Sequence, residues 1–288
     1  MSYLIPTDLV EKMVIAGAVK MNMTTITTLI RAIMAGAILG LAAVFAITVA
    51  IKSGSAVAGA VLFPVGFIML ILFGYDLLTG VVVLGPLAVL AKRNCASAKK
   101  MWRMIGLVFI GNFIGAASVA VMMSFIWTYG FSIEPGIVAS KIATIGESRT
   151  VGYAAYGAMG FATVFIKAML CNWMVSLGVI GAMMSKDLLG KIFAMWMPIM
   201  LFFYMGFEHS IVNMFLFPAG LIMGGEFSII EYFVWNEIPV IFGNVVGGLV
   251  LTGLPLYYAH KRSVKGKIVS SEFEETAVAT RYRPLLIK

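Results

Sequence analysis

A glutamate and a histidine stand side by side in an apolar stretch of the chain. Glu208 and His209 interrupt the run 192–224, which contains no other charged side chain. Imidazole gains and loses a proton near neutral pH, so this pair could take part in proton transfer. Asn213 follows the histidine by four residues, and its amide shares the histidine's face if a helix continues there.

The first half of the chain carries a comparable polar group. Asp76 interrupts the apolar run 57–91, and Thr79 follows it by three residues. A carboxylate in an apolar setting needs hydrogen-bond donors, which favours a structural pairing of acids with asparagine amides. Thr79 and Asn213 could bind a substrate, although such residues in membrane helices also serve simply to join helices. The structural polar residues are expected to be Asp76, Glu208, Asn112 and Asn244.

The composition identifies the setting of these residues as a membrane. Of 288 residues 61% are hydrophobic and 12% are charged, and the mean hydropathy is +1.00. Soluble domains have roughly 45–50% apolar and about 25% charged residues, so a water-soluble globular fold is excluded. No metal-ligand spacing or nucleotide-binding motif occurs, so no metal, cofactor or nucleic-acid partner is expected.

Charged residues divide the chain into apolar runs because charges are costly at the centre of a bilayer. A helix of about 20 residues crosses the hydrocarbon layer. The fold class is therefore predicted to be all-α with six transmembrane helices. The crossings are expected near 29–51, 57–91, 102–128, 160–185, 192–224 and 238–260.

Two halves of the chain match at an offset of 132 residues. Gly74-Tyr75-Asp76 aligns with Gly206-Phe207-Glu208, and Gly111-Asn112 aligns with Gly243-Asn244. Each half has three crossings, so the second half enters the membrane from the opposite side, an inverted repeat typical of transporters and channels. The second and fifth crossings are too long for one span and contain an acid, glycines and a proline. Both are predicted to be broken around a polar path.

The lysines and arginines are distributed unevenly between the two sides of the membrane. One set of segments, which includes both termini, carries 16 of them, and the opposite loops carry three. The positive-inside rule places both termini in the cytoplasm of a multi-pass protein, which we expect in the plasma or inner membrane. The predicted parts are a cytoplasmic segment (1–28), a first repeat (29–128), an outer loop (129–159), a second repeat (160–260) and a cytoplasmic tail (261–288).

Bulky apolar residues flank both predicted breaks. Such side chains can form narrow constrictions that close a pore by excluding water. The candidate constriction residues are Phe63, Phe67, Leu77, Leu78 and Phe202.

Four runs of residues resemble the formate/nitrite transporter family. They are Gly74-Tyr75-Asp76-Leu77-Leu78-Thr79, Leu170-Cys171-Asn172-Trp173, the run from Gly206 to Met214, and the run from Gly243 to Gly248. The resemblance implies an aquaporin-like homopentamer with one pore per protomer. It also implies that Thr79, Asn172, His209 and Asn213 line the pore, and that Lys141, or alternatively Arg149, attracts anions to its outer mouth.

We therefore expect a channel or transporter, not an enzyme, for small monovalent weak-acid anions, with formate or nitrite foremost. The proposed partners are the anion, a proton passed through His209, and the lipid bilayer. Hydrosulfide transport or lactate/proton symport within the same family is the first alternative. An aquaglyceroporin-like channel for neutral solutes is an alternative of another class, although the Asn-Pro-Ala pairs of such channels do not occur.

Overall fold

The computed structural model describes residues 3–93 and 95–260, and the predicted all-α fold is confirmed. In these ranges no strand forms beyond an isolated bridge between Tyr3 and Ser185. The predicted tail 261–288 lies outside the described residues. The helices are α1 (Pro6–Met21), α2 (Thr25–Ser53), α3 (Ala56–Leu62), α4 (Pro64–Leu72), α5 (Leu78–Leu90), α6 (Ala98–Trp127), α7 (Ile137–Ser148), α8 (Val151–Ala154), α9 (Gly157–Met184), α10 (Leu188–Tyr204), α11 (Ser210–Ile222), α12 (Ile229–Tyr232), the π-helix η1 (Phe233–Glu237), α13 (Ile238–Val245) and the π-helix η2 (Val246–Gly253).

Four helical segments of the described chain are long and apolar enough to cross a membrane. They are Thr25–Ser53, Ala98–Trp127, Gly157–Met184 and Ile229–His260. Shorter apolar helices occupy the second and fifth predicted crossings, as α3, α4 and α5 in the first case and α10 and α11 in the second. These crossings are therefore interrupted, as the sequence predicts.

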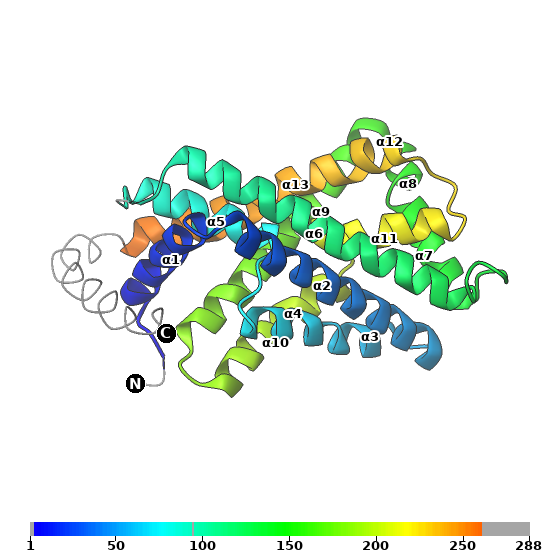
Figure 1. Cartoon of the computed structure of the whole chain (residues 1–288), viewed down its shortest axis with the longest axis horizontal. Coiled ribbons are helices and arrows are strands. Elements are labelled where there is room, and N and C mark those ends of the chain that lie inside the picture. Colours follow the sequence, from blue (N-terminus) through cyan, green and yellow to red (C-terminus); the bar gives the residue numbers. More distant parts are fainter. Residues whose placement is uncertain (1–2, 94, 261–288) are drawn as a thin grey trace, which may run out of the picture.

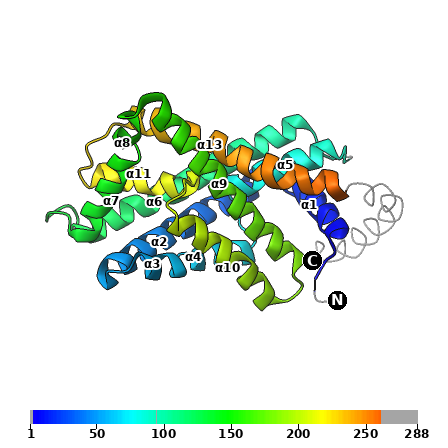
Figure 2. The same ribbon diagram turned by 180° about the vertical axis from the view of Figure 1, so that it is seen from behind.

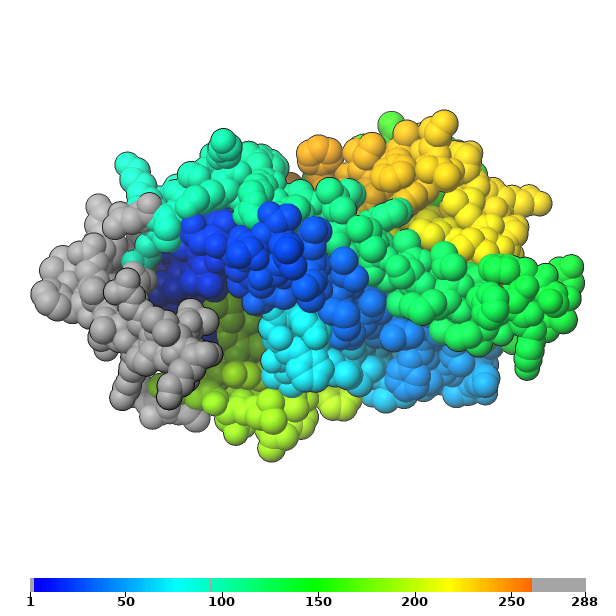
Figure 3. All heavy atoms as spheres, viewed as in Figure 1, coloured from blue at the N-terminus to red at the C-terminus, as the bar shows by residue number. Residues whose placement is uncertain are grey.

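The helices form an elongated bundle whose two ends differ. Helix α1 and the last described helical turns lie at one end, while α7, α8 and α12 lie at the other (Figures 1 and 2). We call these the α1 end and the α8 end. In the space-filling view α1 and α2 (blue) pack beside α6 (teal) on one face (Figure 3), and α2 makes extensive contacts with α6.

Glycines allow the long helices to approach closely. A Cβ atom on Gly115 of α6 would collide with the main-chain oxygen of Ile33 in α2. A Cβ atom on Gly247 of the last span would likewise collide with the main-chain oxygen of Met169 in α9. Gly115 and Gly247 therefore lie where two helix backbones touch.

The two breaks have the same local construction. The residues between α4 and α5 are 73–77 and those between α10 and α11 are 205–209, which differ by the predicted offset of 132. Gly74 and Gly206 adopt left-handed backbone angles, with φ of 73° and 63°. The amides of Tyr75 and Phe207 donate to the carbonyls of Leu70 and Phe202, at 2.8 and 3.0 Å. These bonds end α4 and α10 with the glycine-based cap that stops a helix.

An asparagine from another helix holds the start of each second half-helix. Asn112 accepts from the Leu78 amide at 2.9 Å, and its amide group donates to the main-chain oxygens of Asp76 and Ala32. Asn244 makes the corresponding set, accepting from the Ser210 amide at 3.1 Å. The matched bonding supports two related halves, while their inverted orientation stays a prediction. Both asparagines bind the main chain of the breaks, and not the carboxylates that the sequence suggested.

The segment expected to be an outer loop contains two helices, α7 and α8. Its charges mark it as a loop in the sequence, but Lys141 lies on the exposed side of α7. The opposite side buries Ala139, Ile142 and Ala143, and α7 packs against α11. Only this amphipathic face distinguishes the segment from an irregular loop.

Candidate functional site

The side chain of Asn172 joins the two breaks in the middle of the bundle. It lies on α9 and is fully buried. Its amide group donates to the main-chain oxygen of Thr79 at 3.2 Å and to that of Asn244 at 2.7 Å. Asn244 in turn donates to the main-chain oxygen of Glu208 at 3.0 Å. Two asparagines thus connect the start of α5 to the peptide unit directly before His209.

His209 occupies the N-cap position of α11 and is 1% exposed. Its Nδ1 accepts the amide of Val212 at 3.4 Å. Since Nδ1 accepts, the neutral ring carries its hydrogen on Nε2. Nε2 is buried and has no hydrogen-bond partner among the described residues. The ring therefore presents a free donor inside the protein.

Thr79 is the second residue with an unused polar group. It is 1% exposed, and its hydroxyl oxygen has no hydrogen-bond partner in the part of the chain that the structure describes. Buried polar side chains are bonded in the great majority of cases, so unpaired ones mark candidate binding positions. Thr79 and His209 therefore stand out among the predicted pore residues.

Aromatic side chains cover one face of the histidine. Phe202 stacks on the His209 ring with centroids 5.5 Å apart, and Phe63 meets Phe202 edge to face at 5.6 Å. In the first half of the chain, Phe67 and Leu77 line a pocket of about 50 Å³ that also includes Thr79. All five candidate constriction residues are buried: Phe63, Phe67, Leu77, Leu78 and Phe202.

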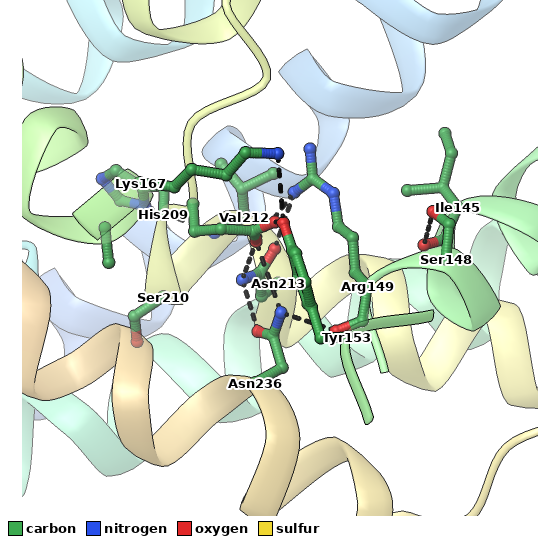
Figure 4. A network of polar contacts seen from close by, with 12 residues as sticks. Ile145, Ser148, Arg149, Tyr153, Lys167, His209, Ser210, Val212, Asn213 and Asn236 are labelled. Atoms are coloured by element: carbon green, nitrogen blue, oxygen red, sulfur yellow. Dashed lines mark hydrogen bonds and ion pairs between the residues drawn. The ribbon is translucent and has the colours of Figure 1, made fainter. Parts of the chain in front are cut away.

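Toward the α8 end, a cluster of polar side chains surrounds the carboxylate of Glu208, which is fully buried. Arg149 pairs with it at 3.2 Å, Tyr153 donates to it at 2.8 Å and Asn213 donates to it at 3.0 Å. Asn213 also donates to the side-chain oxygen of Asn236 at 2.7 Å. Figure 4 shows these side chains converging, with the Lys167 ammonium directed at the Tyr153 hydroxyl, 3.2 Å away. We call this group the Glu208 cluster.

A second carboxylate lies toward the α1 end and is also paired with cations. Asp76 is 3% exposed and contacts the ammonium of Lys20 from α1. Arg31 of α2 places its Nε 2.8 Å from the other carboxylate oxygen. Each break therefore carries one buried acid whose negative charge is balanced by cationic side chains from neighbouring helices.

The structure brings some of the predicted pore residues to the two breaks and places others elsewhere. Asn172 lies between the two breaks, but Asn213 is occupied by Glu208 and Asn236. Lys141 is exposed on α7, whereas Arg149, its alternative, reaches Glu208 and also donates to Asn213 at 3.1 Å. No group of three or more potential metal-ligating side chains occurs within residues 3–93 and 95–260.

The sequence reasoning missed several members of these clusters, chiefly Tyr153, Asn236, Lys20 and Arg31. Lys20 and Arg31 reach Asp76 only through the packing of α1 and α2, which no local sequence pattern indicates. Asn236 stands next to an acid at the start of the last apolar run, which was the one local signal available for it.

The chain is similar to known transport proteins over most of its length. A family model described as formate/nitrite transporter matches residues 7–258. A "probable formate transporter" of Methanothermobacter thermautotrophicus is 35% identical over 71% of this chain and 74% of its own. An "uncharacterized transporter YrhG" of Bacillus subtilis is 32% identical over 93% and 97%, respectively. The "formate channel BtFdhC" of Bacillus thuringiensis is 29% identical over 89% and 96%.

Two solved structures share this arrangement of helices. One, described as an "FNT family ion channel", superposes with a TM-score of 0.75 over 88% of this chain and 99% of the other. The second, described as a pentameric formate channel with formate bound, gives a TM-score of 0.65 over 82% and 97%. Both are 24% identical in sequence, so they establish the similarity of the fold.

Proposed function

The chain belongs to the formate/nitrite transporter family, and on this premise we propose that it carries formate or nitrite across the membrane with the help of His209. As a member of this family it is an integral membrane channel or transporter and not an enzyme. Relatives named as formate transporters or channels support a small monovalent anion as the substrate.

One observation carries the proposal for the site. The hydroxyl of Thr79 and the Nε2 of His209 are both buried without a hydrogen-bond partner among the described residues, at the starts of the two half-helices α5 and α11. A carboxylate or nitrite could accept hydrogen bonds from both groups. We infer that these atoms bind the anion and that Asn172 maintains the geometry between them.

The half-helices add a favourable electrostatic environment. A helix N-terminus carries a partial positive charge, and anions are commonly bound there. Helices α5 and α11 both begin at buried breaks, with Leu78 and Ser210 as their first residues, each less than a twentieth exposed. The start of each helix would therefore stabilise a negative charge between the constrictions.

Neutralising the anion would lower the barrier at the constrictions. A bare charge between Phe63, Phe202 and His209 faces a desolvation cost of several kcal/mol. In the proposed step, the ring takes up a proton from water at Nδ1, loses the long bond to Val212 and gives the Nε2 proton to the anion. The ring is then neutral with its hydrogen on Nδ1. Release of that hydrogen to water and uptake of another at Nε2 restore the starting tautomer and the bond from Val212. The resulting weak acid crosses the next constriction without charge.

The outer cation, the orientation in the membrane and the assembly are proposals of the same kind. We propose Lys141, which is exposed on α7, as the cation that draws anions toward the outer mouth, because Arg149, its alternative, is already paired with Glu208. We propose that the α1 end faces the cytoplasm and that the protein assembles as a homopentamer. The neighbour described as a pentameric formate channel is the support for this assembly.

The substrate proposal is tested with purified protein in proteoliposomes. Formate, nitrite, hydrosulfide and lactate compete for labelled formate uptake at two pH values, and glycerol-driven swelling is measured in parallel. Formate or nitrite uptake well above that of protein-free liposomes, with no glycerol swelling, is expected. Glycerol permeation without anion uptake would refute the proposal and favour a neutral-solute channel. Preferred uptake of lactate or hydrosulfide would establish the family alternative.

A further inference from the structure

Glu237 is a buried acid that the proposed mechanism does not use. It ends the π-helix η1 in the last span and is fully buried within a single protomer. The Ser210 hydroxyl donates to one of its carboxyl oxygens, and the Tyr232 hydroxyl donates to the other at 2.9 Å. π-Helical turns often occur at functional sites because the additional residue redirects neighbouring side chains. Here Asn236 and Glu237 are adjacent in sequence, yet both are buried.

The surroundings of Glu237 differ from those of the other two buried acids. Asp76 and Glu208 pair with cations, whereas Glu237 has no ion pair with any residue in the described part of the chain. Burying a carboxylate without a cation is costly, so such a group is more stable as the neutral acid. Both of its partners are hydroxyls, which can donate or accept. The site can therefore hold a carboxylic acid or a carboxylate without exchanging partners.

Ser210 places this acid next to the transport site. It is the first residue of α11 and directly follows His209. In Figure 4 its hydroxyl points away from the Glu208 cluster, and it bonds instead to Glu237. A negative charge on Glu237 would therefore lie close to the N-terminus of α11, where the proposed mechanism needs an environment favourable to anions.

The other ionisable groups around η1 already form ion pairs or hydrogen bonds with one another. Glu208, in the break before α11, is paired with Arg149. Tyr153 of α8 and Lys167 of α9 belong to the same cluster. Asn236 separates this cluster from Glu237 and bonds to Glu208 at 3.4 Å. The cations of the Glu208 cluster thus serve Glu208, and Glu237 faces hydroxyls.

We propose that Glu237 is a second proton-binding group of this transporter, and that its protonation controls how readily an anion occupies the site at His209. This inference rests on the proposed function. With the carboxyl neutral, the start of α11 attracts the anion. When the carboxyl releases its proton to water, the remaining carboxylate repels the anion, and uptake decreases.

The first test measures the carboxyl group itself. Infrared difference spectra of the reconstituted protein, recorded during a pH titration, should show the carbonyl stretch of a buried protonated carboxyl group. The band should disappear in Glu237→Gln and persist in Glu226→Gln, a control at an exposed position. A band unchanged in Glu237→Gln, or no band in wild type, would overturn the inference.

The second test measures formate uptake across the same pH range. For each protein, uptake at alkaline pH is divided by uptake at acidic pH. This ratio should be roughly tenfold higher for Glu237→Gln than for wild type, because the glutamine side chain cannot become charged. Tyr232→Phe removes one donor to the carboxylate, so the decrease in uptake should move to higher pH. Identical profiles for wild type and both variants would overturn the inference and leave the proposed function intact. Absence of formate uptake by wild type would instead contradict the proposed function.

Discussion

Replacing Arg149 by Met should destabilise the protein by leaving the Glu208 carboxylate without its cation. Removing one partner of a buried ion pair costs about 3–5 kcal/mol. The arginine side chain is 20% exposed, and Tyr153 and Asn213 still donate to Glu208. We therefore expect the lower end of that range, about 3 kcal/mol. The variant should also transport less formate, since the Glu208 cluster next to His209 loses its ion pair.

The assay is a double-mutant cycle read out by thermal unfolding in detergent. Arg149→Met should lower the midpoint by several degrees. Adding Glu208→Gln removes the unpaired charge and should recover most of the loss, a coupling of about 2–3 kcal/mol. Lys141→Met, at an exposed position, should stay within about 0.5 kcal/mol of wild type. Additive losses from Arg149→Met and Glu208→Gln would refute the reasoning, as would a stability of Arg149→Met equal to that of Lys141→Met.

Three further variants test other parts of the structure. Asn172→Ala leaves the main-chain oxygens of Thr79 and Asn244 without this donor, at a cost of about 1–3 kcal/mol of stability each. It should lower both thermal stability and formate uptake, and unchanged values would contradict the role of Asn172 between the breaks. Gly115→Val should prevent correct folding, as judged by size-exclusion chromatography, because a side chain there meets the Ile33 backbone, whereas Gly106→Ala, with open space around it, should behave like wild type. Phe202→Ala should raise the lactate-to-formate uptake ratio several-fold by widening the constriction, while the exposed control Phe193→Ala should not; equal ratios would exclude Phe202 as the selectivity constriction.

The positions of the two breaks were predictable because several local signals agreed. Crossings too long for one span, a glycine before each acid, and the constant offset of 132 residues all indicated 73–77 and 205–209. The asparagines were predictable as structural residues for the same reason. Their bonding partners were not, because a sequence does not indicate whether an amide binds a carboxylate or the main chain.

The buried charges were the hardest part to predict. Treating each charge as a boundary between spans placed the start of the last crossing at 238, directly after Glu237. The structure instead buries Glu237 inside a helical segment that begins at Ile229. The charge rule describes contact with lipid, whereas this acid contacts only other parts of the protein. The ion pair of Arg149 was equally hard to predict, since its partner Glu208 is 59 residues away in the chain.

The most direct test of the proposed mechanism is the number of protons that accompany each formate. Proteoliposomes with an internal pH dye and labelled formate report both fluxes at once, for wild type and for His209→Asn, a polar side chain that carries no titratable proton. We predict that wild type takes up about one proton with each formate, and that His209→Asn loses this coupled uptake. Coupled uptake at the wild-type rate in His209→Asn would contradict the role of the histidine in protonating the anion.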